Sequence, residues 1–309
     1  MKYIFGVDLG GTTVKIGLFS ESGEVLEKWE IVTVKENNGS KILPDIADSI
    51  KAKVAEKNID KNDVIGVGIG VPGPVDSNGT IFGAANLGWG TFNVSETLGN
   101  LTGFKVKTGN DANVAALGEM WMGGGKGYKS IVMVTLGTGV GGGVIIDEKI
   151  VAGAKGAGGE IGHIFVNPDE TEACGCGKKG CLEQYGSATG VVRLAQRRLA
   201  KDDKESILRG KDIDCKAVWD AVKEGDEVAI EIAEEFGLIL GNGLGVIACV
   251  VNPEAFVIGG GVSKAGEILL DYIVKNFKET TFRGCKETDF KLATLGNDAG
   301  IFGAAKLVL

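Results

Sequence analysis

One glycine-rich pattern occurs twice in this chain, and each time it joins two apolar runs that are typical of β-strands. The first copy, DLGGTT, spans residues 8–13, and the second, TLGTG, spans residues 135–139. Segments with helical periodicity occur in both halves of the chain. The repetition indicates an internal duplication of one α/β unit, and the alternation of strands with helices favours an α/β architecture.

The length of 309 residues exceeds the roughly 250–300 at which a single hydrophobic core stops growing, so two domains are expected. Strands are predicted at residues 3–8, 14–19, 25–34, 64–71, 104–108, 131–136, 144–146 and 255–258. Helical patterns are predicted at residues 40–57, 113–121 and 299–307, and over much of 189–250. The first three strands are expected to form an antiparallel meander.

The most apolar stretch of the chain covers residues 236–251, where Asn242 is the polar exception. It is shorter than the roughly 18–20 residues that cross the hydrocarbon core of a bilayer, and Asn252-Pro253 ends it. Glycines at positions 237, 241 and 245 suit close packing against neighbouring elements. The stretch therefore predicts a buried helix of a soluble protein.

Composition and charge exclude several classes of protein. Glycine contributes 51 of 309 residues, but without a three-residue period and with only 5 prolines, so neither collagen nor a low-complexity linker fits. A net charge of -8 and a pI near 5.0 disfavour nucleic acid as a partner. The apolar run before Asp8 is too short for a secretory signal, so we expect a cytoplasmic protein with no membrane partner.

Both glycine-rich turns suit phosphate binding, because backbone N–H groups converge there and no side chain blocks an anion. Plain tight turns are the alternative interpretation. Residues 137–142 also match GxGxxG, but a strand-like run follows where a dinucleotide fingerprint requires a helix. No GxxxxGK[ST] phosphate loop occurs in the chain.

The segment Asn110-Asp111-Ala112-Asn113 follows a predicted strand and begins a predicted helix. Asn and Asp are preferred helix N-caps, which is the structural interpretation. The functional interpretation is that Asp111 acts as a general base, accepting the proton of a hydroxyl that attacks a phosphoryl group. The two flanking phosphate-type loops support the second interpretation.

Cysteine and histidine cluster between residues 160 and 183. The single histidine, His163, precedes Cys174, Cys176 and Cys181, which are three of the six cysteines. Three sulfur ligands and one imidazole form a Cys₃His set that is common in structural Zn²⁺ sites, and the intervening glycines let the chain wrap around an ion. A disulfide is a poorer explanation in a reducing cytosol, and incidental thiols are the remaining alternative.

Two carboxylates flank this cluster. Glu160 lies three residues before His163, and Glu183 lies two residues after Cys181. A metal ion bound by this cluster would hold both glutamate side chains in place as hydrogen-bond acceptors for sugar hydroxyls. The alternative interpretation is that both glutamates are solvated surface residues.

Seven motifs together resemble the ROK family (repressor, open reading frame, kinase). They lie at residues 8–12, 71–76, 86–89, 110–113, 136–143, 160–163 and 174–183. Their order and spacing match from residue 3 to about 305, so the resemblance covers essentially the whole chain.

The resemblance implies a two-domain α/β fold of the actin, hexokinase and Hsp70 (ribonuclease H-like) type, with ATP and sugar meeting in an interdomain cleft. We expect residues 1–109 plus 297–309 to form the small domain and residues 110–296 to form the large domain with the zinc site. Asp111 would be the catalytic base, and Asp8 would help to place the Mg²⁺ that accompanies ATP. The nucleotide would be contacted by two phosphate loops and an adenosine segment: Gly10, Gly11 and Thr12; Gly137, Thr138 and Gly139; and Gly259, Gly260 and Gly261.

On the sugar side, the resemblance implies hydroxyl contacts from Gly73, Asn86, Asn110, Asp111, Glu160, His163 and Glu183. One ring nitrogen of His163 would bind zinc while the other faces the sugar. The Zn²⁺ would be structural, shaping the pocket and taking no part in the chemistry.

The motif at residues 86–89, after the Pro-Gly-Pro-Val-Asp loop, resembles bacterial glucokinases within the family. The predicted activity is transfer of the ATP γ-phosphoryl group to the 6-hydroxyl of glucose. Fructose, allose, N-acetylglucosamine and N-acetylmannosamine are alternative substrates, and a non-catalytic sugar sensor is an alternative function. A repressor would need a DNA-binding domain ahead of Tyr3, which we do not expect here. Family members are often dimers or tetramers, so a homo-oligomer is expected.

Overall fold

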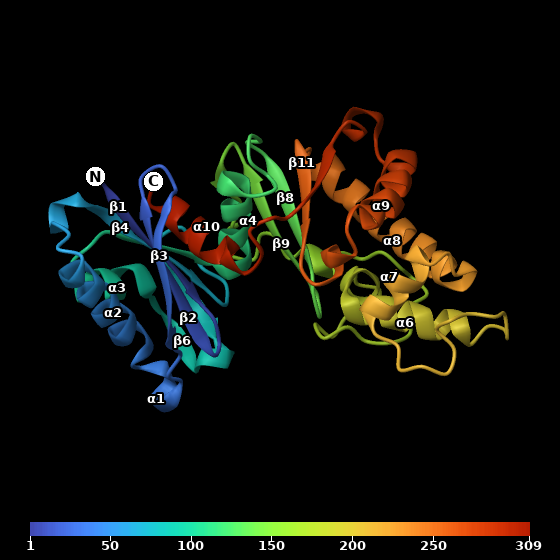
Figure 1. Cartoon of the computed structure of the whole chain (residues 1–309), viewed down its shortest axis with the longest axis horizontal. Coiled ribbons are helices and arrows are strands. Elements are labelled where there is room, and N and C mark those ends of the chain that lie inside the picture. The colour runs from blue at the N-terminus through green and yellow to red at the C-terminus, as the bar shows by residue number, and fades with distance from the viewer. The chain divides into compact units, whose positions relative to one another are not determined.

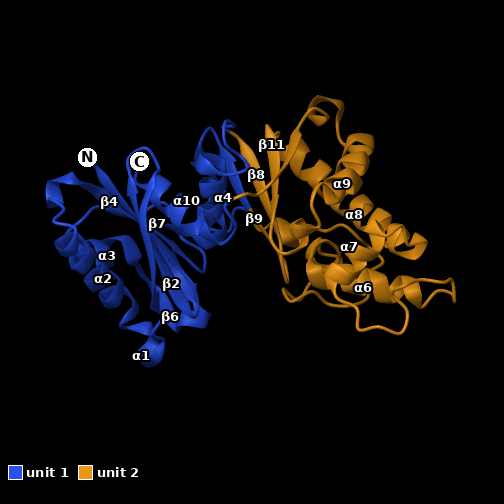
Figure 2. Cartoon of the chain, in the orientation of Figure 1, with its two compact units in different colours: residues 1–129, 143–159, 295–309 blue, residues 130–142, 160–294 orange.

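The computed structural model describes all residues, 1–309, and divides them into two compact units (Figure 2). Unit 1 comprises Met1–Lys129, Gly143–Gly159 and Leu295–Leu309, and unit 2 comprises Ser130–Gly142 and Glu160–Thr294. Each unit holds one main sheet with helices against it, so the chain has the predicted α/β character.

The sheet of unit 1 has the order β3-β2-β1-β4-β7. Its strands are β1 (Tyr3–Leu9), β2 (Thr13–Ser20), β3 (Val25–Val32), β4 (Val64–Val71) and β7 (Val106–Asn110). The first three strands pair antiparallel, as predicted, whereas β4 and β7 continue the sheet in parallel. A separate hairpin, β5 (Thr80–Ala84) with β6 (Trp89–Asn93), was not predicted, because each strand is only 5 residues long.

Helices cover both faces of this sheet (Figure 1). One face packs against α2 (Ile42–Glu56) and α3 (Val94–Thr102), and the other packs against α4 (Asp111–Met122) and α10 (Ala299–Leu307). A short turn of helix, α1 (Glu36–Gly39), precedes α2.

Alternate residues of the central strands explain why α10 can approach the sheet so closely. Side chains point alternately to the two faces of a strand, so Phe5 and Val7 enter the core under α2 while Gly6 faces α10. A Cβ at Gly6 or at Gly68 would collide with the backbone of α10. The alternating glycines of residues 64–71 therefore give that helix access to the sheet.

The second five-stranded sheet has the order β10-β9-β8-β11-β12. Unit 2 contributes β8, β11, β12 and the start of β9, and residues 143–159 of unit 1 contribute the end of β9 and β10. The strands of this sheet are β8 (Ile131–Leu136), β9 (Val140–Ile146), β10 (Lys149–Ile150), β11 (Ala255–Gly259) and β12 (Asp289–Leu292). β9 and β10 pair antiparallel, while β8 and β12 lie parallel to β11. This order matches β3-β2-β1-β4-β7 strand for strand, which confirms the predicted duplication.

The helices of unit 2 are α5 (Glu183–Gly186), α6 (Ala188–Leu199), α7 (Cys215–Lys223), α8 (Glu227–Val251) and α9 (Glu267–Thr280). By length and composition α8 could cross a membrane, and half of its most apolar window is buried inside the chain. It packs against α6, α7 and α9, as the core helix predicted for residues 236–251 would.

The predicted domain boundaries differ from the two units at residues 110–129, 143–159 and 295–296, which pack with unit 1. α4 joins unit 1 because Gly118 of α4 and Gly303 of α10 let the two helix backbones come together without intervening side chains. This contact joins segments about 185 residues apart in sequence, so helical periodicity alone does not reveal it.

Candidate functional site

In unit 1, Asn110 ends β7 and caps α4, and Asp111 is the first residue of that helix. The Asn110 Oδ1 accepts a hydrogen bond of 3.2 Å from the backbone N–H of Asn113, so the cap is Asn110. The Asp111 Oδ1 accepts hydrogen bonds from the backbone N–H of Ala112 at 2.8 Å and from the Asn110 Nδ2 at 3.0 Å. These bonds orient a carboxylate that does not serve as the cap, which fits the functional interpretation of Asp111.

Gly73 lies beside this pair. The Asn110 Nδ2 also donates to the Gly73 carbonyl oxygen, at 3.1 Å. Gly73 has φ of +130°, and a Cβ there would lie 2.5 Å from the carbonyl oxygen of Gly83. Only glycine suits this position.

The first glycine-rich turn follows β1 and is closed by a hydrogen bond of 3.0 Å from the Gly10 N–H to the Thr13 carbonyl oxygen. Thr33, the residue after β3, also holds this turn: its hydroxyl donates a hydrogen bond of 2.8 Å to the Gly10 carbonyl oxygen. The Asn86 amide lies near Gly11, at 3.9 Å from where a Cβ on that glycine would be. The structure thus brings the predicted residues Gly10, Gly11 and Asn86 together.

Asp8 stands at the end of β1, next to this turn. Burial raises the pKa of its carboxyl group, the charge of Lys15 lowers that pKa, and the charge of Asp111 raises it. Lys15 is the residue opposite Asp8 on β2. Asp8 and Asp111 are therefore close enough to interact electrostatically within unit 1, and a cation beside them would relieve their repulsion.

The second glycine-rich turn lies in unit 2, between β8 and β9. The Gly137 N–H donates to the Gly139 carbonyl oxygen at 2.9 Å, and the Ala188 N–H at the start of α6 donates to the Gly137 carbonyl oxygen at 2.8 Å. The Thr189 hydroxyl donates to the Thr138 carbonyl oxygen at 2.9 Å. The turn is therefore fixed against the N-terminus of α6, a location that suits an anion.

Glu183 connects this turn to the cysteine cluster. Its Oε2 accepts a hydrogen bond of 3.0 Å from the Val140 N–H, and its Oε1 lies 3.4 Å from the Cys174 sulfur, which donates to it. A Cβ at Gly139 would collide with the same carboxylate. Glu183 is thus held in a defined orientation, contrary to the alternative of a solvated side chain.

The four predicted metal ligands, His163, Cys174, Cys176 and Cys181, come together with all ligand atoms within 4.8 Å of one another. The sulfur atoms of Cys176 and Cys181 are 3.6 Å apart, and the Cys174 sulfur is 3.8 Å from the His163 Nδ1. In a tetrahedral zinc site with Zn–S bonds of about 2.3 Å, neighbouring ligand atoms are about 3.8 Å apart. The donor set and its spacing therefore fit Zn²⁺.

The pKa values of these thiols are also consistent with a bound cation. Burial and the adjacent thiols raise the pKa of Cys181 to about 12, and burial raises the pKa of Cys174. A backbone hydrogen bond from Lys178 lowers the pKa of the exposed Cys176. Two buried sulfurs can ionise beside a third only if a positive charge compensates them, and a divalent ion supplies that charge.

His163 lies in a 3-10 turn (Ile161–His163), where its N–H donates to the Glu160 carbonyl oxygen at 3.1 Å. Because its Nδ1 faces the cysteines, its Nε2 is the nitrogen that remains for another partner. Glu160 itself is exposed.

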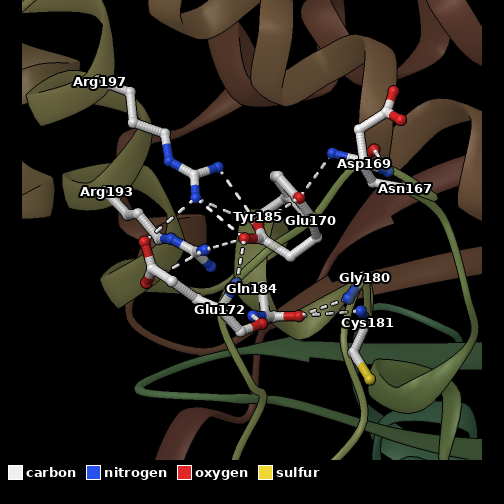
Figure 3. A network of polar contacts seen from close by, with 10 residues as sticks. All are labelled: Asn167, Asp169, Glu170, Glu172, Gly180, Cys181, Gln184, Tyr185, Arg193 and Arg197. Carbon is white, nitrogen blue, oxygen red and sulfur yellow. Dashed lines mark hydrogen bonds and ion pairs between the residues drawn. The ribbon is translucent and has the colours of Figure 1, made fainter.

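A polar network that sequence analysis missed supports the cysteine-bearing segment (Figure 3). The Gln184 Oε1 accepts hydrogen bonds from the N–H groups of Gly180 and Cys181, at 2.8 Å and 3.1 Å. Its Nε2 donates to the Glu172 carbonyl oxygen at 3.0 Å. The Gln184 side chain thus links the two ends of the loop that carries the three cysteines by hydrogen bonds.

Glu170 anchors the same loop to α6. Its side chain has no exposed surface and forms ion pairs with Arg193 at 2.6 Å and Arg197 at 3.1 Å, and the Tyr185 hydroxyl donates to it at 2.6 Å. Burial raises the pKa of Glu170, but hydrogen bonds from Arg197, Tyr185 and the Glu172 backbone outweigh burial and lower the pKa to about 2. Glu170 is therefore ionised at neutral pH.

A cavity of about 650 Å³ lies in unit 2 beside the predicted adenosine segment. Its lining includes Thr138 of the second turn and Gly261, two residues after the end of β11, as well as Cys215 and Trp219 of α7. Gly260 has φ of +85° and packs against the backbone of Leu136, so this close approach requires glycine at position 260. The α7 residues of the cavity carry no motif, and sequence analysis missed them.

The geometry thus assembles two sets of predicted residues. Unit 1 brings together Asp8, Gly10, Gly11, Gly73, Asn86, Asn110 and Asp111 around the ends of β1 and β7. Unit 2 brings together the zinc ligands, Glu183 and the turn at 137–139.

Comparison with known proteins identifies the family of this chain. The model of the ROK family matches residues 4–309. A glucokinase of Halalkalibacterium halodurans is 42% identical, with 99% of this chain and 95% of that protein covered. The crystal structure of a ROK family glucokinase from Streptomyces griseus in complex with glucose and AMPPNP is 37% identical, with a TM-score of 0.71 over 99% of this chain and 98% of that one. A ROK hexokinase from Thermus thermophilus is 30% identical, with a TM-score of 0.80 over 99% of this chain and 97% of that one.

Proposed function

Because the chain belongs to the ROK family, we propose that it catalyses the ATP-dependent phosphorylation of glucose to glucose 6-phosphate. The observation that carries this proposal is the full-length likeness to glucokinases, one of them solved with glucose and AMPPNP. The chain is accordingly a hexose kinase with the two-domain actin and hexokinase type of fold.

Asp111 is the proposed general base. As the 6-hydroxyl oxygen of glucose attacks the γ-phosphorus, the Asp111 carboxylate accepts the hydroxyl proton. A bond forms between the sugar oxygen and the γ-phosphorus, the bond from that phosphorus to the bridging oxygen breaks, and ADP leaves. The hydrogen bonds from Ala112 and Asn110 keep the carboxylate in one orientation for this step.

Two groups of backbone N–H donors would hold the ATP phosphates: Gly10, Gly11 and Thr12 in unit 1, and Gly137, Thr138 and Gly139 in unit 2. The Mg²⁺ that accompanies ATP neutralises phosphate charge, and Asp8 would hold that ion through water. The electrostatic interaction between Asp8 and Asp111 supports a cation at this end of β1. Gly259, Gly260 and Gly261 would contact the adenosine, and the adjoining cavity of about 650 Å³ has room for a nucleoside.

Glucose would be bound through its hydroxyls. The proposed ligands are Gly73, Asn86, Asn110 and Asp111 from unit 1, and Glu160, His163 and Glu183 from unit 2. A structural Zn²⁺ would be held by His163, Cys174, Cys176 and Cys181, and it would supply rigidity and not redox or acid–base chemistry. The contacts of Glu183 and the orientation of His163 support a sugar site organised by this cluster. We further propose that the enzyme acts in the cytoplasm.

The Asp111→Asn variant tests the assignment. It should bind glucose with nearly wild-type affinity in calorimetry and lose roughly 10²–10⁴-fold or more in kcat in an assay coupled to glucose 6-phosphate, because general-base catalysis contributes that much. Asp63→Asn, which changes an exposed carboxylate of unit 1, is the matched control and should keep wild-type kcat. Near-normal turnover by Asp111→Asn would remove Asp111 from its proposed role.

A further inference from the structure

Lys15 of β2 is a basic residue of unit 1 close to the first glycine-rich turn. In the antiparallel register of β1 and β2 it stands opposite Asp8. Residues that face each other in an antiparallel pair project from the same side of the sheet. The flanking residues Val14 and Ile16 are buried in the core on the α2 side, so Lys15 projects from the side of the sheet that α10 covers, as Asp8 does.

The Lys15 ammonium group has no carboxylate partner. Its Nζ donates a hydrogen bond of 3.1 Å to the carbonyl oxygen of Asn297, in the turn that leads into α10. Asp8 of β1 and Glu30 of β3 both stand opposite Lys15, yet it forms an ion pair with neither of them. An ammonium group has three donors, so two of them remain for another acceptor.

The charges at this end of β1 do not balance. Among the charged groups that act on the Asp8 carboxyl group, Asp111 is an anion and Lys15 is the cation. Two carboxylates and one ammonium group leave a net negative charge where the proposed function brings the phosphates of ATP. The Mg²⁺ that accompanies ATP offsets part of the phosphate charge, and an ammonium group beside the turn offsets more of it.

The present partner of Lys15 is one that it can exchange. The Asn297 carbonyl oxygen is a neutral acceptor, and a hydrogen bond from an ammonium group to a charged phosphate oxygen is stronger than one to a neutral carbonyl. The lysine side chain carries its charge on a flexible four-carbon stem with rotatable donors. Lys15 can therefore turn from Asn297 to a phosphate held by the adjacent turn.

We propose that Lys15 is a further catalytic residue, whose ammonium group moves from the Asn297 carbonyl oxygen to a non-bridging oxygen of the ATP γ-phosphate. This inference rests on the proposed function, because it needs ATP as the phosphoryl donor. As the γ-phosphorus passes from the bridging oxygen of ADP to the 6-hydroxyl oxygen of glucose, Lys15 stabilises the charge on the phosphoryl oxygens. The hydroxyl proton goes to Asp111, and Lys15 stays protonated throughout.

Steady-state kinetics of the full chain with glucose and MgATP test the proposal. Lys15→Met removes the charge, and it should lower kcat by about 10²-fold with little change in the KM for glucose, as expected for one donor that stabilises the transition state. Lys15→Arg keeps the charge and should recover most of the lost kcat. Lys28→Met is the matched control, because Lys28 of the neighbouring β3 pairs with Asp298 in the same turn, at 2.6 Å, and its loss should leave kcat unchanged.

Nucleotide binding measured by calorimetry tests which phosphate Lys15 contacts. Lys15→Met should weaken the binding of MgAMPPNP by about tenfold and that of MgADP much less, because only AMPPNP carries a γ-phosphate. Equal weakening of both nucleotides would contradict a contact with the γ-phosphate. Thermal unfolding checks that the Lys15→Met and Lys28→Met variants keep their fold.

The kinetic outcomes separate this inference from the proposed function. Wild-type kcat in Lys15→Met would overturn the role of Lys15, and so would equal losses of kcat in Lys15→Met and Lys28→Met, which would show that both lysines only hold the turn before α10. A folded Lys15→Arg variant as slow as Lys15→Met would contradict a role for the charge. A wild-type chain that turns over no hexose would reject the proposed function and this inference with it, whereas an active wild-type chain leaves only Lys15 in question.

Discussion

Gly300 leaves room for the carboxylate of Asp8, and this single position shows how the chain arranges charge near the end of β1. A Cβ on Gly300 would lie 2.5 Å from the Asp8 Cγ and 2.6 Å from its Oδ2. The first residues of α10 can therefore approach Asp8 only because position 300 is glycine. The motif at residues 8–12 indicates Asp8 from sequence, whereas nothing in the sequence connects Asp8 with residue 300.

The Gly300→Ala variant should displace the Asp8 carboxylate. The fold should stay intact, since the Asp8 side chain can rotate away from the added methyl group. We expect the KM for MgATP to rise by about tenfold, which corresponds to roughly 1.4 kcal/mol of lost binding. Gly90→Ala is the matched control, because a Cβ there meets no atom within 4 Å. Steady-state kinetics at varied Mg²⁺ measure the effect, and an unchanged KM in Gly300→Ala would contradict the role proposed for Asp8.

Cys176 offers a test of the metal, because it is the exposed member of the cluster. Metal analysis of protein purified without added zinc should find about one Zn²⁺ per chain, and Cys176→Ser should lower that content, because one thiolate ligand is lost. Cys249→Ser, which removes another exposed thiol, should not. Full activity and full stability in a metal-free preparation would refute a structural zinc.

At the scale of elements, the loop that carries the three cysteines depends on α5 and α6. Its ligand set could be predicted because His163 and the cysteines lie within 19 residues of one another in sequence, with glycines between them. The supporting contacts could not be predicted, because Arg193 and Arg197 are two of several basic residues on an amphipathic helix. Only the folded chain shows that they pair with Glu170 (Figure 3).

Replacing Glu170 by glutamine should destabilise unit 2, because it leaves two guanidinium groups without their buried partner. We expect a loss of about 3 kcal/mol in the free energy of unfolding, measured by denaturant titration, together with faster loss of zinc to a chelator. Glu172→Gln is the matched control, since its side chain is 65% exposed and its ion pairs contribute less than about 1 kcal/mol. Equal stabilities for the two variants would contradict the anchoring role.

The same network predicts that the stability of the fold depends on pH. The pKa of Glu170 falls from 4.5 to about 2 on folding, so its contribution to stability is complete above pH 4.5 and is lost as the pH falls toward 2. The difference in stability between the wild-type chain and Glu170→Gln should therefore shrink through that window. A difference that stays constant with pH would contradict the ionised network.

At the scale of the whole molecule, the duplication explains why the fold could be predicted further than the site. Two glycine-rich turns between strands indicated two copies of one α/β unit, and the two sheets have the same strand order. The sequence also indicated which motifs carry chemistry: the glycine-rich turns and Asn110-Asp111 follow predicted strands, and the zinc ligands form a cluster of cysteines with the single histidine. It did not reveal that α4 and residues 143–159 pack with unit 1, or that α7 lines the cavity near Gly261. Those features depend on contacts between segments far apart in the chain.

The roles proposed for these residues all depend on one reaction, the transfer of the γ-phosphoryl group of ATP to glucose. The most direct test measures kcat/KM with ATP and Mg²⁺ for glucose, fructose, allose, N-acetylglucosamine and N-acetylmannosamine, and identifies the phosphorylated product. We predict the highest kcat/KM for glucose, with glucose 6-phosphate as the product. Sugar binding without turnover of any hexose would contradict the account and favour a sensor, and a higher kcat/KM for another hexose would contradict its assignment of glucose.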